Sequence, residues 1–512
     1  MTAALKKEIP MTASAENDAL VDRSRGLNFE EPLLIERSLE GRSGVDFPAP
    51  KGLKSRTGQA TRKTIGLPQV SEPQAVRHFV RLSQQNFSID SGFYPLGSCT
   101  MKHNPRLNEK VARLPGLANL HPMQDERTTQ GALELMYELQ HWLTEMTGLP
   151  GVSLAPAAGA QGEMAGMLVI RKALEKRGEL EQRRIVLVPD SAHGTNPATA
   201  VMCGFEIKTL PSTDQGFVDM DAFKEALGDD VAGFMLTNPN TCGLFDPNVK
   251  EIADLLHAAG GYFYCDGANF NAIAGRVRPA DFGADVMHIN LHKTFSTPHG
   301  GGGPGSGPIV VTEELEPFLP VPRVQKDGDN YTLEYEAEDS IGRMKGFHGH
   351  MGMFVRALAY MMAHGIDGIR QASEDAVLNA NYVRVKLQDH YHVPFNGMCM
   401  HECLLSDKKQ KAKGVTTMDI AKALIEHGMH PMTVFFPLVV QGAMLIEPTE
   451  SETKETIDRF IAIMKKIADE TEAGNGEQFL ELPKSTPRRR LDEAKAARKP
   501  TLTWQMMMEN NG

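Results

Sequence analysis

The chain has 512 residues, of which 41% are hydrophobic and 23% are charged, and its formal net charge is −11 at pH 7. This balance is typical of a globular protein and argues against general binding to nucleic acid or to an anionic membrane. The longest apolar stretch, residues 432–446, is interrupted by Pro437 and Gly442 and is too short to span a bilayer. The N-terminal sequence has no apolar core behind its first lysines and soon becomes acidic, so we expect neither a secretory signal nor a transit peptide, and a cytoplasmic protein.

Residues 1–125 are predicted to form an N-terminal arm and extension. Up to about Pro73 the sequence is rich in proline, glycine and charge and shows little periodicity. This composition is typical of a segment that becomes ordered by lying on another surface.

Residues 126–325 are predicted to form a large α/β domain. Apolar residues recur every three or four positions in residues 131–148, which predicts a helix that ends at a glycine. Short apolar runs at residues 185–190, 233–239 and 261–267 are each followed by a helix-like stretch. This alternation predicts a mostly parallel sheet that is covered on both faces, with the chemistry where strands end and helices begin.

Residues 326–482 are predicted to form a smaller α/β C-terminal domain. Helical patterns occur near residues 351–364 and 457–471, and residues 393–406 and 432–448 have the composition of strands in a smaller sheet. The tail, residues 483–512, carries seven Lys or Arg against two acids before Thr501. Such a charge pattern favours a solvated, partly helical terminus over a docking segment.

Six cysteines in a chain of this length do not indicate a disulfide framework. Cys399 and Cys403 enclose His401, which raises the alternative of a metal site. A closed zinc site needs four ligands, and the sequence has no second Cys/His pair at the spacing that would complete it. We therefore predict no metal site, and ordinary buried thiols.

Lys293 lies in an unusual sequence context. It directly follows the strand-like run of residues 286–292, it stands among hydroxyl residues, and a glycine run, Gly300–Gly303, follows it. A surface lysine before a flexible loop would be the ordinary interpretation. A lysine beside a buried strand is costly unless it is used or paired, and a lysine amine can form a Schiff base with an aldehyde. The glycines permit close approach of the backbone to an anion such as a phosphate.

Three further signals surround this lysine in the predicted sheet. Small residues at Gly159–Gln161 open a helix, which is a favourable place for an anion. His193 follows one predicted strand, and Asp266 ends another. Pyridoxal phosphate needs a lysine for its aldehyde, an acid for its pyridine nitrogen, a flat group on its ring and an anion cradle. Lys293, Asp266, His193 and the loop would supply these parts in that order.

Several long segments have an unusual and specific sequence: NFSIDSGFYPLGSCTMKHNPRLNE, PAAGAQGE, DSAHGTNPA, TNPNTCGLFD, HINLHKTFSTPHGGGGPG and RRLDEAKAARKP. These segments resemble the glycine dehydrogenase (decarboxylating) family, also called the glycine cleavage P-protein. The likeness runs from about Leu34 to Trp504. The length is similar to that of the split form, in which a subunit 1 pairs with a lysine-bearing subunit 2. Residues 1 to about 25 are an extension that the resemblance does not explain.

The resemblance implies fold type I of the pyridoxal-phosphate enzymes, with an N-terminal arm, a large domain and a smaller C-terminal domain. By matching motif, Lys293 would hold the cofactor covalently, His193 would stack on its ring and Asp266 would pair with its pyridine nitrogen. The remaining contacts would come from the backbone at Gly159, Ala160 and Gln161 and from His292 at the phosphate, and from Asn269 at the ring hydroxyl.

The implied reaction is the decarboxylation of glycine, with transfer of the aminomethyl group to the lipoyl arm of H-protein. The implied partners are glycine, lipoylated H-protein and subunit 1, with two copies of each subunit. Another fold type I enzyme, an aminotransferase or a different amino-acid decarboxylase, is an alternative because one fold hosts many reactions. The alternative from another class is a non-catalytic assembly subunit, which should lack Lys293.

Overall fold

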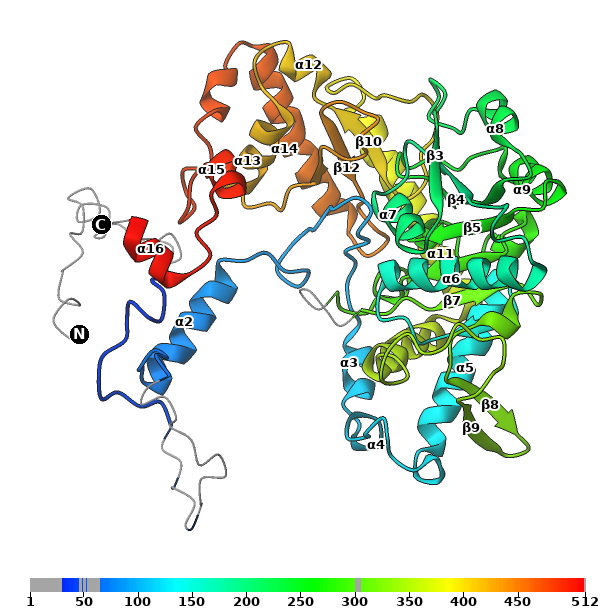
Figure 1. Ribbon diagram of the computed structural model, residues 1–512. Helices are drawn as coiled ribbons and strands as arrows, with labels where there is room; N and C mark the ends of the chain where they lie inside the picture. Colours follow the sequence, from blue (N-terminus) through cyan, green and yellow to red (C-terminus); the bar gives the residue numbers. More distant parts are fainter. Residues whose placement is uncertain (1–29, 46–47, 49–51, 53–64, 300–304, 511–512) are drawn as a thin grey trace. The chain divides into compact units, whose positions relative to one another are not determined.

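Figure 1 shows a computed structural model of the chain, which describes residues 30–45, 48, 52, 65–299 and 305–510. The chain divides into two compact units, one made of Met1–Ser88 with Glu481–Gly512 and the other of Ile89–Leu480. The N-terminal extension and the run Gly300–Gly303 lie outside the described residues. The domain boundaries expected from the sequence stay predictions.

The first unit contains the helices α2 (Glu72–Gln84), α15 (Glu493–Arg498) and α16 (Trp504–Asn510). Ser71 and Gln74 form a capping box that begins α2. The Arg81 guanidinium donates to both oxygens of Glu31, at 2.5 and 2.7 Å, and holds the pKa of that carboxyl down at about 2. Because α15 and α16 both lie within residues 483–512, the basic tail is partly helical, as its composition predicts.

The second unit is built on a seven-stranded sheet with the strand order β1-β7-β6-β5-β4-β2-β3. Each neighbouring pair among strands β2 to β6 is parallel. Strand β7 is antiparallel to both of its neighbours, β1 and β6. The mostly parallel sheet is confirmed. Its strands are β1 (Gly151–Ser153), β2 (Ile185–Pro189), β3 (Glu206–Leu210), β4 (Val231–Thr237), β5 (Tyr262–Gly267), β6 (Val286–Ile289) and β7 (Ile309–Val311).

Successive side chains of a strand point to opposite faces of the sheet, and apolar residues of this sheet are buried on both faces. In β5, Phe263 and Cys265 belong to one buried core, while Tyr262 and Tyr264 belong to the other. The first core also takes residues from α5 (Gln130–Thr147), α8 (Met220–Ala226) and α9 (Val249–Ala258), and the second from α6 (Gly159–Arg177) and α7 (Thr195–Met202). Helices on both faces are the arrangement that the sequence rhythm predicts (Figure 1).

The C-terminal part of the second unit carries a three-stranded antiparallel sheet with the order β10-β12-β11. These strands are shorter than the stretches expected from the sequence: β10 is Cys403–Ser406, β11 is Thr433–Val434 and β12 is Ala443–Ile446. The helices α12 (Lys408–Lys411), α13 (Thr417–Glu426) and α14 (Lys454–Glu472) accompany them.

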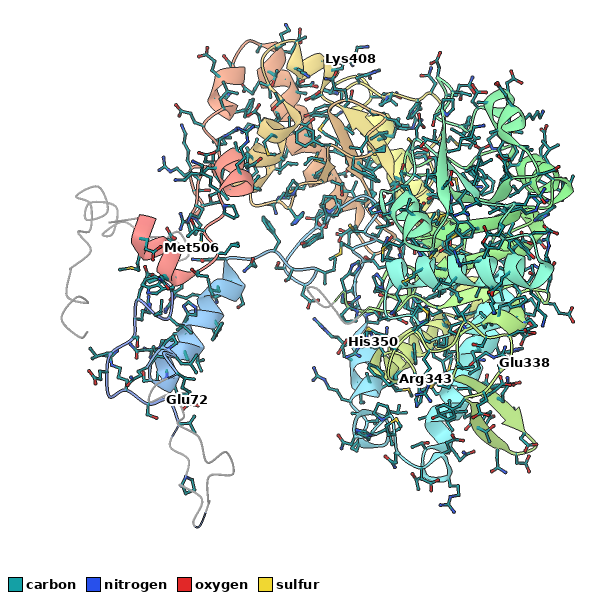
Figure 2. The ribbon with its side chains drawn as sticks, in the orientation of Figure 1. Glu72, Glu338, Arg343, His350, Lys408 and Met506 are labelled. Carbon is teal, nitrogen blue, oxygen red and sulfur yellow. The ribbon has the colours of Figure 1, made fainter. Side chains whose placement is uncertain are left out.

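Helix α11 (Met351–Leu387) is two helical stretches joined at Gly365, and the helix expected near residues 351–364 corresponds to the first of them. Gly365 adopts φ 61° and ψ 179°, which interrupts the helical backbone, and the helix then continues to Leu387. A glycine supplies this positive φ without steric cost. His350, labelled in Figure 2, precedes α11, and its Nδ1 lies 2.6 Å from the carbonyl oxygen of Gly305.

The remaining elements are short. They are α3 (Arg106–Ala112), α4 (Pro115–Ala118), α10 (Leu291–Thr294), the hairpin of β8 (Arg323–Asp327) and β9 (Asn330–Glu334), and several single 3₁₀ turns. Among the helices that the structure describes, none combines the length and apolar character needed to cross a membrane.

Candidate active site

The predicted site residues gather in one cavity of about 340 Å³ at the carboxyl ends of the parallel strands. Asp266 comes from β5, Thr237 from β4 and Asn290 from the residue after β6, while the N-terminus of α6 faces them from the other side. This is the edge at which open α/β sheets bind ligands. Seven of the eight predicted residues line the cavity: Gly159, Ala160, His193, Asp266, Asn269, His292 and Lys293.

Lys293 lies in α10, a single helical turn that follows β6 directly. Its backbone N–H donates to the carbonyl oxygen of Asn290 at 3.0 Å, so the turn begins where the strand ends. Because the turn is this short, the lysine stays at the strand end and its side chain lines the cavity with Asp266 and His292.

Asp266 is buried at the end of β5, within a polar network. Its Oδ2 accepts from Asn196 at 3.0 Å, its Oδ1 accepts from the backbone N–H of Ala268 at 2.9 Å, and His288 Nε2 lies 3.4 Å from Oδ1. Burial opposes its ionisation, but His288 and the two hydrogen bonds outweigh this effect and lower its pKa. Asp266 is therefore ionised in the protein and can hold a positive charge at a ring nitrogen.

Sequence reasoning missed the partners of Asp266. Glu163 accepts from Thr195 Oγ1 at 2.7 Å and from Asn196 Nδ2 at 3.0 Å, so Asn196 bridges the two buried acids. Burial, followed by the charge of Asp266, raises the pKa of Glu163. His288 is paired in register with Asp266 across β5 and β6. A histidine inside an apolar strand was the available signal for it.

His193 lies between β2 and α7, on the exposed side of the cavity. Its Nδ1 lies 2.8 Å from Thr195 Oγ1, which fixes the orientation of the ring. The Phe436 ring lies edge-on to it, with the two centroids 5.7 Å apart. The flat group that the sequence predicts is thus beside the cavity, with an aromatic neighbour from the smaller sheet region.

The first turn of α6 offers backbone N–H groups to the cavity. Ala158 is the N-cap, and the first intrahelical bond runs from the Gly162 N–H to the Ala158 carbonyl oxygen, so the preceding N–H groups lack helical partners. The side chain of Gln161 turns away, to the Ala157 N–H at 2.7 Å and the Met344 carbonyl oxygen at 3.3 Å. Gln161 is the one predicted residue that does not line the cavity, and its side chain is engaged elsewhere, so only its backbone remains for the predicted role.

His292 stands beside this helix terminus as a neutral imidazole. Burial, then the nearby His299 and Lys293, lower its pKa to about 3. Its Nδ1 accepts from the Ser306 backbone N–H at 3.3 Å, so its single ring hydrogen is on Nε2. A neutral histidine in this state donates one hydrogen bond, which suits the oxygen of a phosphate.

The polar atoms on the cavity wall are compatible with the polar groups of pyridoxal phosphate. Among the described residues that line the cavity, three have a buried side-chain oxygen without a hydrogen-bond partner: Thr237 Oγ1, Asn269 Oδ1 and Asn290 Oδ1. The Asn269 amide nitrogen is held by the Pro239 carbonyl oxygen at 3.0 Å, which leaves its Oδ1 available. Such oxygens can accept hydrogen bonds from a polar ligand in the cavity. A pyridine ring with hydroxyl and phosphate groups fits such a wall.

We predict that Gly159→Ala weakens cofactor binding by roughly 10- to 100-fold, since overpacking costs about 1–3 kcal/mol. A Cβ atom at Gly159 would lie 2.4 Å from Asn290 Oδ1, so either the helix terminus or the Asn290 side chain on the cavity wall would have to shift. Gly194→Ala is the matched control, because that glycine has φ −58° and open space around it. Titration of both variants with pyridoxal phosphate checks this, and equal affinities would contradict it.

A second buried group lies behind the cavity wall. His401 Nε2 is 3.8 Å from Glu447 Oε1, and Glu402 completes a cluster whose side-chain ligand atoms lie within 4.8 Å of one another. Neither Cys399 nor Cys403 belongs to this cluster, and all six cysteines of the chain are free thiols. The CMHEC motif therefore brings its histidine to carboxylates rather than to thiols. That the chain holds no metal ion stays a prediction.

Glu447 predicts a pH dependence of stability. Burial raises its pKa to about 7, although hydrogen bonds from Thr100 oppose the shift. The folded state therefore holds this proton more tightly than the unfolded chain, whose pKa stays near 4.5. The resulting stabilisation is complete below that value and is lost as the pH rises through about 7. We expect a loss on the order of 1–3 kcal/mol, and Glu447→Gln should remove it.

Urea unfolding of the wild type and of Glu447→Gln at about pH 5 and about pH 8 checks this expectation. The pKa of the neighbouring Glu402 is raised for the same reason, so part of the slope should remain in the variant. The advantage of the wild type over Glu447→Gln in free energy of unfolding should be larger at about pH 5 than at about pH 8. An advantage that is larger at the higher pH would contradict the prediction.

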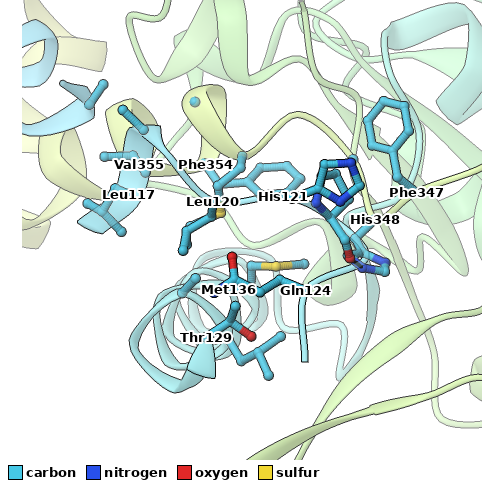
Figure 3. Close-up of a pocket in the computed structure, with 18 of the residues that line it drawn as sticks. Leu117, Leu120, His121, Gln124, Thr129, Met136, Phe347, His348, Phe354 and Val355 are labelled. Atoms are coloured by element: carbon cyan, nitrogen blue, oxygen red, sulfur yellow. Dashed lines mark hydrogen bonds between the residues drawn. The ribbon is translucent and has the colours of Figure 1, made fainter. Parts of the chain in front are cut away.

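A separate cavity of about 340 Å³ lies between α4, α5 and the start of α11. Figure 3 shows its apolar wall, which includes Leu117, Leu120, Met136, Phe354 and Val355. His121 and His348 are at its edge, but the described residues that line it include no acid, lysine or arginine. It therefore lacks the groups for the chemistry that the Lys293 cavity offers.

Solved structures similar to this chain define its class. A crystal structure of glycine decarboxylase (P-protein) of the glycine cleavage system, in inhibitor-bound form, matches with a TM-score of 0.66 at 20% identity, covering 82% of this chain and 93% of that one. A NifS-like protein matches with a TM-score of 0.58 at 15% identity, covering 74% and 99%. The chain has the fold of the type I pyridoxal-phosphate enzymes.

Sequence comparison gives the family. Residues 46–333 match "Glycine cleavage system P-protein", and residues 372–482 match "Glycine dehydrogenase, C-terminal domain". A probable glycine dehydrogenase (decarboxylating) subunit 2 of Caulobacter vibrioides is 55% identical over 508 residues, covering 97% of both chains. A protein of the same description from Listeria innocua is 53% identical over 487 residues, covering 94% of this chain and 99% of that one. The chain belongs to the glycine cleavage system P-protein family.

Proposed function

We propose that this chain catalyses the decarboxylation of glycine with pyridoxal phosphate and transfers the aminomethyl group to the lipoyl arm of H-protein. One observation carries the proposal: Lys293, the ionised Asp266 and the N-terminus of α6 line a single cavity. These three parts serve the aldehyde, the ring nitrogen and the phosphate of that cofactor. The family to which the chain belongs supports glycine as the substrate.

Each residue takes the role that its position favours. Lys293 holds the cofactor through its amine, Asp266 keeps a proton on the ring nitrogen, and His193 lies on the ring. The backbone at Gly159, Ala160 and Gln161 binds the phosphate together with the Nε2–H of His292. Asn269 offers Oδ1 to the ring hydroxyl, because its amide nitrogen is already held by Pro239.

When bound, the cofactor accepts the electron pair that is released as the glycine carboxylate leaves as CO₂. Asp266 makes this acceptance favourable because its low pKa keeps a negative charge next to the ring nitrogen. A C–S bond would then form between the glycine methylene carbon and one lipoyl sulfur, and the S–S bond would break. The second sulfur would leave with the electron pair and take up a proton, and the amine of Lys293, which lines the cavity, could accept and return protons nearby.

The proposed reaction needs glycine and lipoylated H-protein as partners. Resemblance to the split form adds a subunit 1, with two copies of each subunit in the assembly. The proteins from Caulobacter and Listeria are described as subunit 2, which supports a partner subunit for this chain. A cytoplasmic location and the absence of nucleic-acid binding stay predictions from the sequence.

A screen of amino acids tests the substrate against the alternative reactions on the same fold. Cofactor-loaded protein is mixed with glycine, alanine, glutamate or aspartate, and the absorbance of the cofactor is followed. We expect glycine to change the spectrum at the lowest concentration; alanine is the matched control because it adds one methyl group. A spectrum that responds to glutamate or aspartate but not to glycine would favour an aminotransferase or another decarboxylase.

A further inference from the structure

A short segment, Gly97–His103, connects the smaller sheet to the Lys293 turn; we call it the strap. At its first residue, the Gly97 N–H donates to the Leu445 carbonyl oxygen at 3.2 Å, and Thr433 donates to the Gly97 carbonyl oxygen at 2.8 Å. A Cβ atom at Gly97 would lie 2.3 Å from Leu445 Cγ, so the strap lies directly against β12. The strap residues Gly97, Ser98 and Cys99 also line the Lys293 cavity.

Three alternate residues of the strap are each held by an acid next to the smaller sheet. The pairs are Ser98 with Glu402, Thr100 with Glu447 and Lys102 with Glu450, at 2.7, 3.0 and 2.7 Å. Ser98 and Thr100 have φ of 63° and 46°, a backbone conformation that non-glycine residues seldom adopt. Such a conformation persists only where its surroundings fix it, and it clusters at functional sites.

The other end of the strap holds the turn that carries the lysine. Lys102 Nζ donates to the Thr294 carbonyl oxygen at 2.7 Å and to Asn271 Oδ1 at 2.8 Å. One residue later, the His103 carbonyl oxygen accepts from the hydroxyl of Ser296. The contacts with Thr294 and Ser296 reach the chain within three residues of Lys293.

Lys102 is almost fully buried, with 4% of its surface exposed, and its three ammonium hydrogens meet three close acceptors. A buried charge requires such a full set of partners. The Thr294 carbonyl is at the C-terminal end of α10, where carbonyl groups lack helical partners and a cation is favourable. A hydrogen bond here fixes where α10 ends, and therefore where Lys293 points.

We propose that Lys102 is a positioning residue for Lys293: it fixes the carbonyl end of α10, and its pairing with Glu450 ties this turn to the smaller sheet. The inference rests on the proposed role of Lys293 in holding the cofactor. Lys102 itself does not line the cavity among the described residues, so it acts through the backbone of Thr294.

The test measures how fast Lys293 attaches to added pyridoxal phosphate in the full-length chain, with the attachment fixed by borohydride and located by peptide mass spectrometry. Lys102→Met removes the ammonium group and keeps the apolar stem. Because this change removes the ion-pair partner of the part-buried Glu450, the double variant Lys102→Met/Glu450→Gln is made as well, so that a folded variant is available. Lys176→Met is the matched control, since it removes a surface lysine paired with Asp339 at 2.8 Å.

We expect attachment at Lys293 to slow by roughly 10- to 100-fold in both Lys102 variants and to be unchanged in Lys176→Met, because a small displacement of a reacting group has effects of this size. In loaded enzyme, kcat should fall while the KM for glycine stays the same. Wild-type attachment rates in the folded double variant would overturn the proposal. A wild-type chain that attaches no cofactor at Lys293 would instead overturn the proposed function, and this inference with it.

Discussion

Lys293→Ala should lose glycine turnover by about 10³-fold or more while the protein remains folded. The amine of Lys293 is the group that forms and releases the covalent link to the cofactor, and loss of a reacting group has effects of at least this order. The fold should survive because the side chain lines the cavity and takes no part in either buried core. The measurement is glycine turnover with a fixed amount of bound pyridoxal phosphate, together with a thermal unfolding curve.

Lys176→Met is a suitable control for this experiment too, because it removes one lysine charge at the surface. Borohydride reduction of the loaded wild type should place the cofactor on the peptide that contains Lys293, and on no other lysine peptide. Turnover in Lys293→Ala within about tenfold of the wild type would show that another residue holds the cofactor.

Asp266→Asn should lower turnover by roughly 10²- to 10⁴-fold. This substitution keeps the shape of the side chain and removes its charge. Loss of one partner from a buried charge pair costs about 3–5 kcal/mol, which corresponds to this range of rates. The ring nitrogen would no longer be held in its protonated state, so the release of CO₂ should slow more than the binding of glycine weakens.

Two measurements distinguish this role from a structural one. Turnover and the KM for glycine are determined for Asp266→Asn, and its cofactor affinity is measured by equilibrium dialysis. Glu163→Gln is the matched variant, because it removes the neighbouring buried acid that shares Asn196 with Asp266. Turnover in Asp266→Asn equal to that of the wild type would rule out the role at the ring nitrogen.

The sequence predicts those parts of the site whose signals are local. Lys293 and His193 each follow a buried strand and Asp266 lies at the end of another, and parallel strands place their carboxyl ends at one edge, so the three were expected to meet. The fold class follows from the same rhythm. A backbone role was also expected for Gln161, and its side-chain amide is bound elsewhere, to Ala157 and Met344.

The parts that the sequence did not predict depend on long-range pairing. Ser98 and Glu402 are 304 residues apart, and Lys102 and Glu450 are 348 apart, so no pattern along the chain connects them. Pairs of this kind are fixed by the tertiary fold rather than by local propensity. The helical stretch of α11 that follows Gly365 and ends at Leu387 was not predicted either.

Glycine-dependent exchange of labelled bicarbonate tests the central claim most directly. The full-length chain is assayed alone, with subunit 1, and with subunit 1 and lipoylated H-protein together; H-protein without its lipoyl group is the control. We predict that label enters the carboxyl group of glycine in the complete mixture and that this requires glycine, the lipoyl group and the partner subunit. No exchange in the complete mixture, from protein that carries its cofactor, would contradict the assignment to glycine decarboxylation.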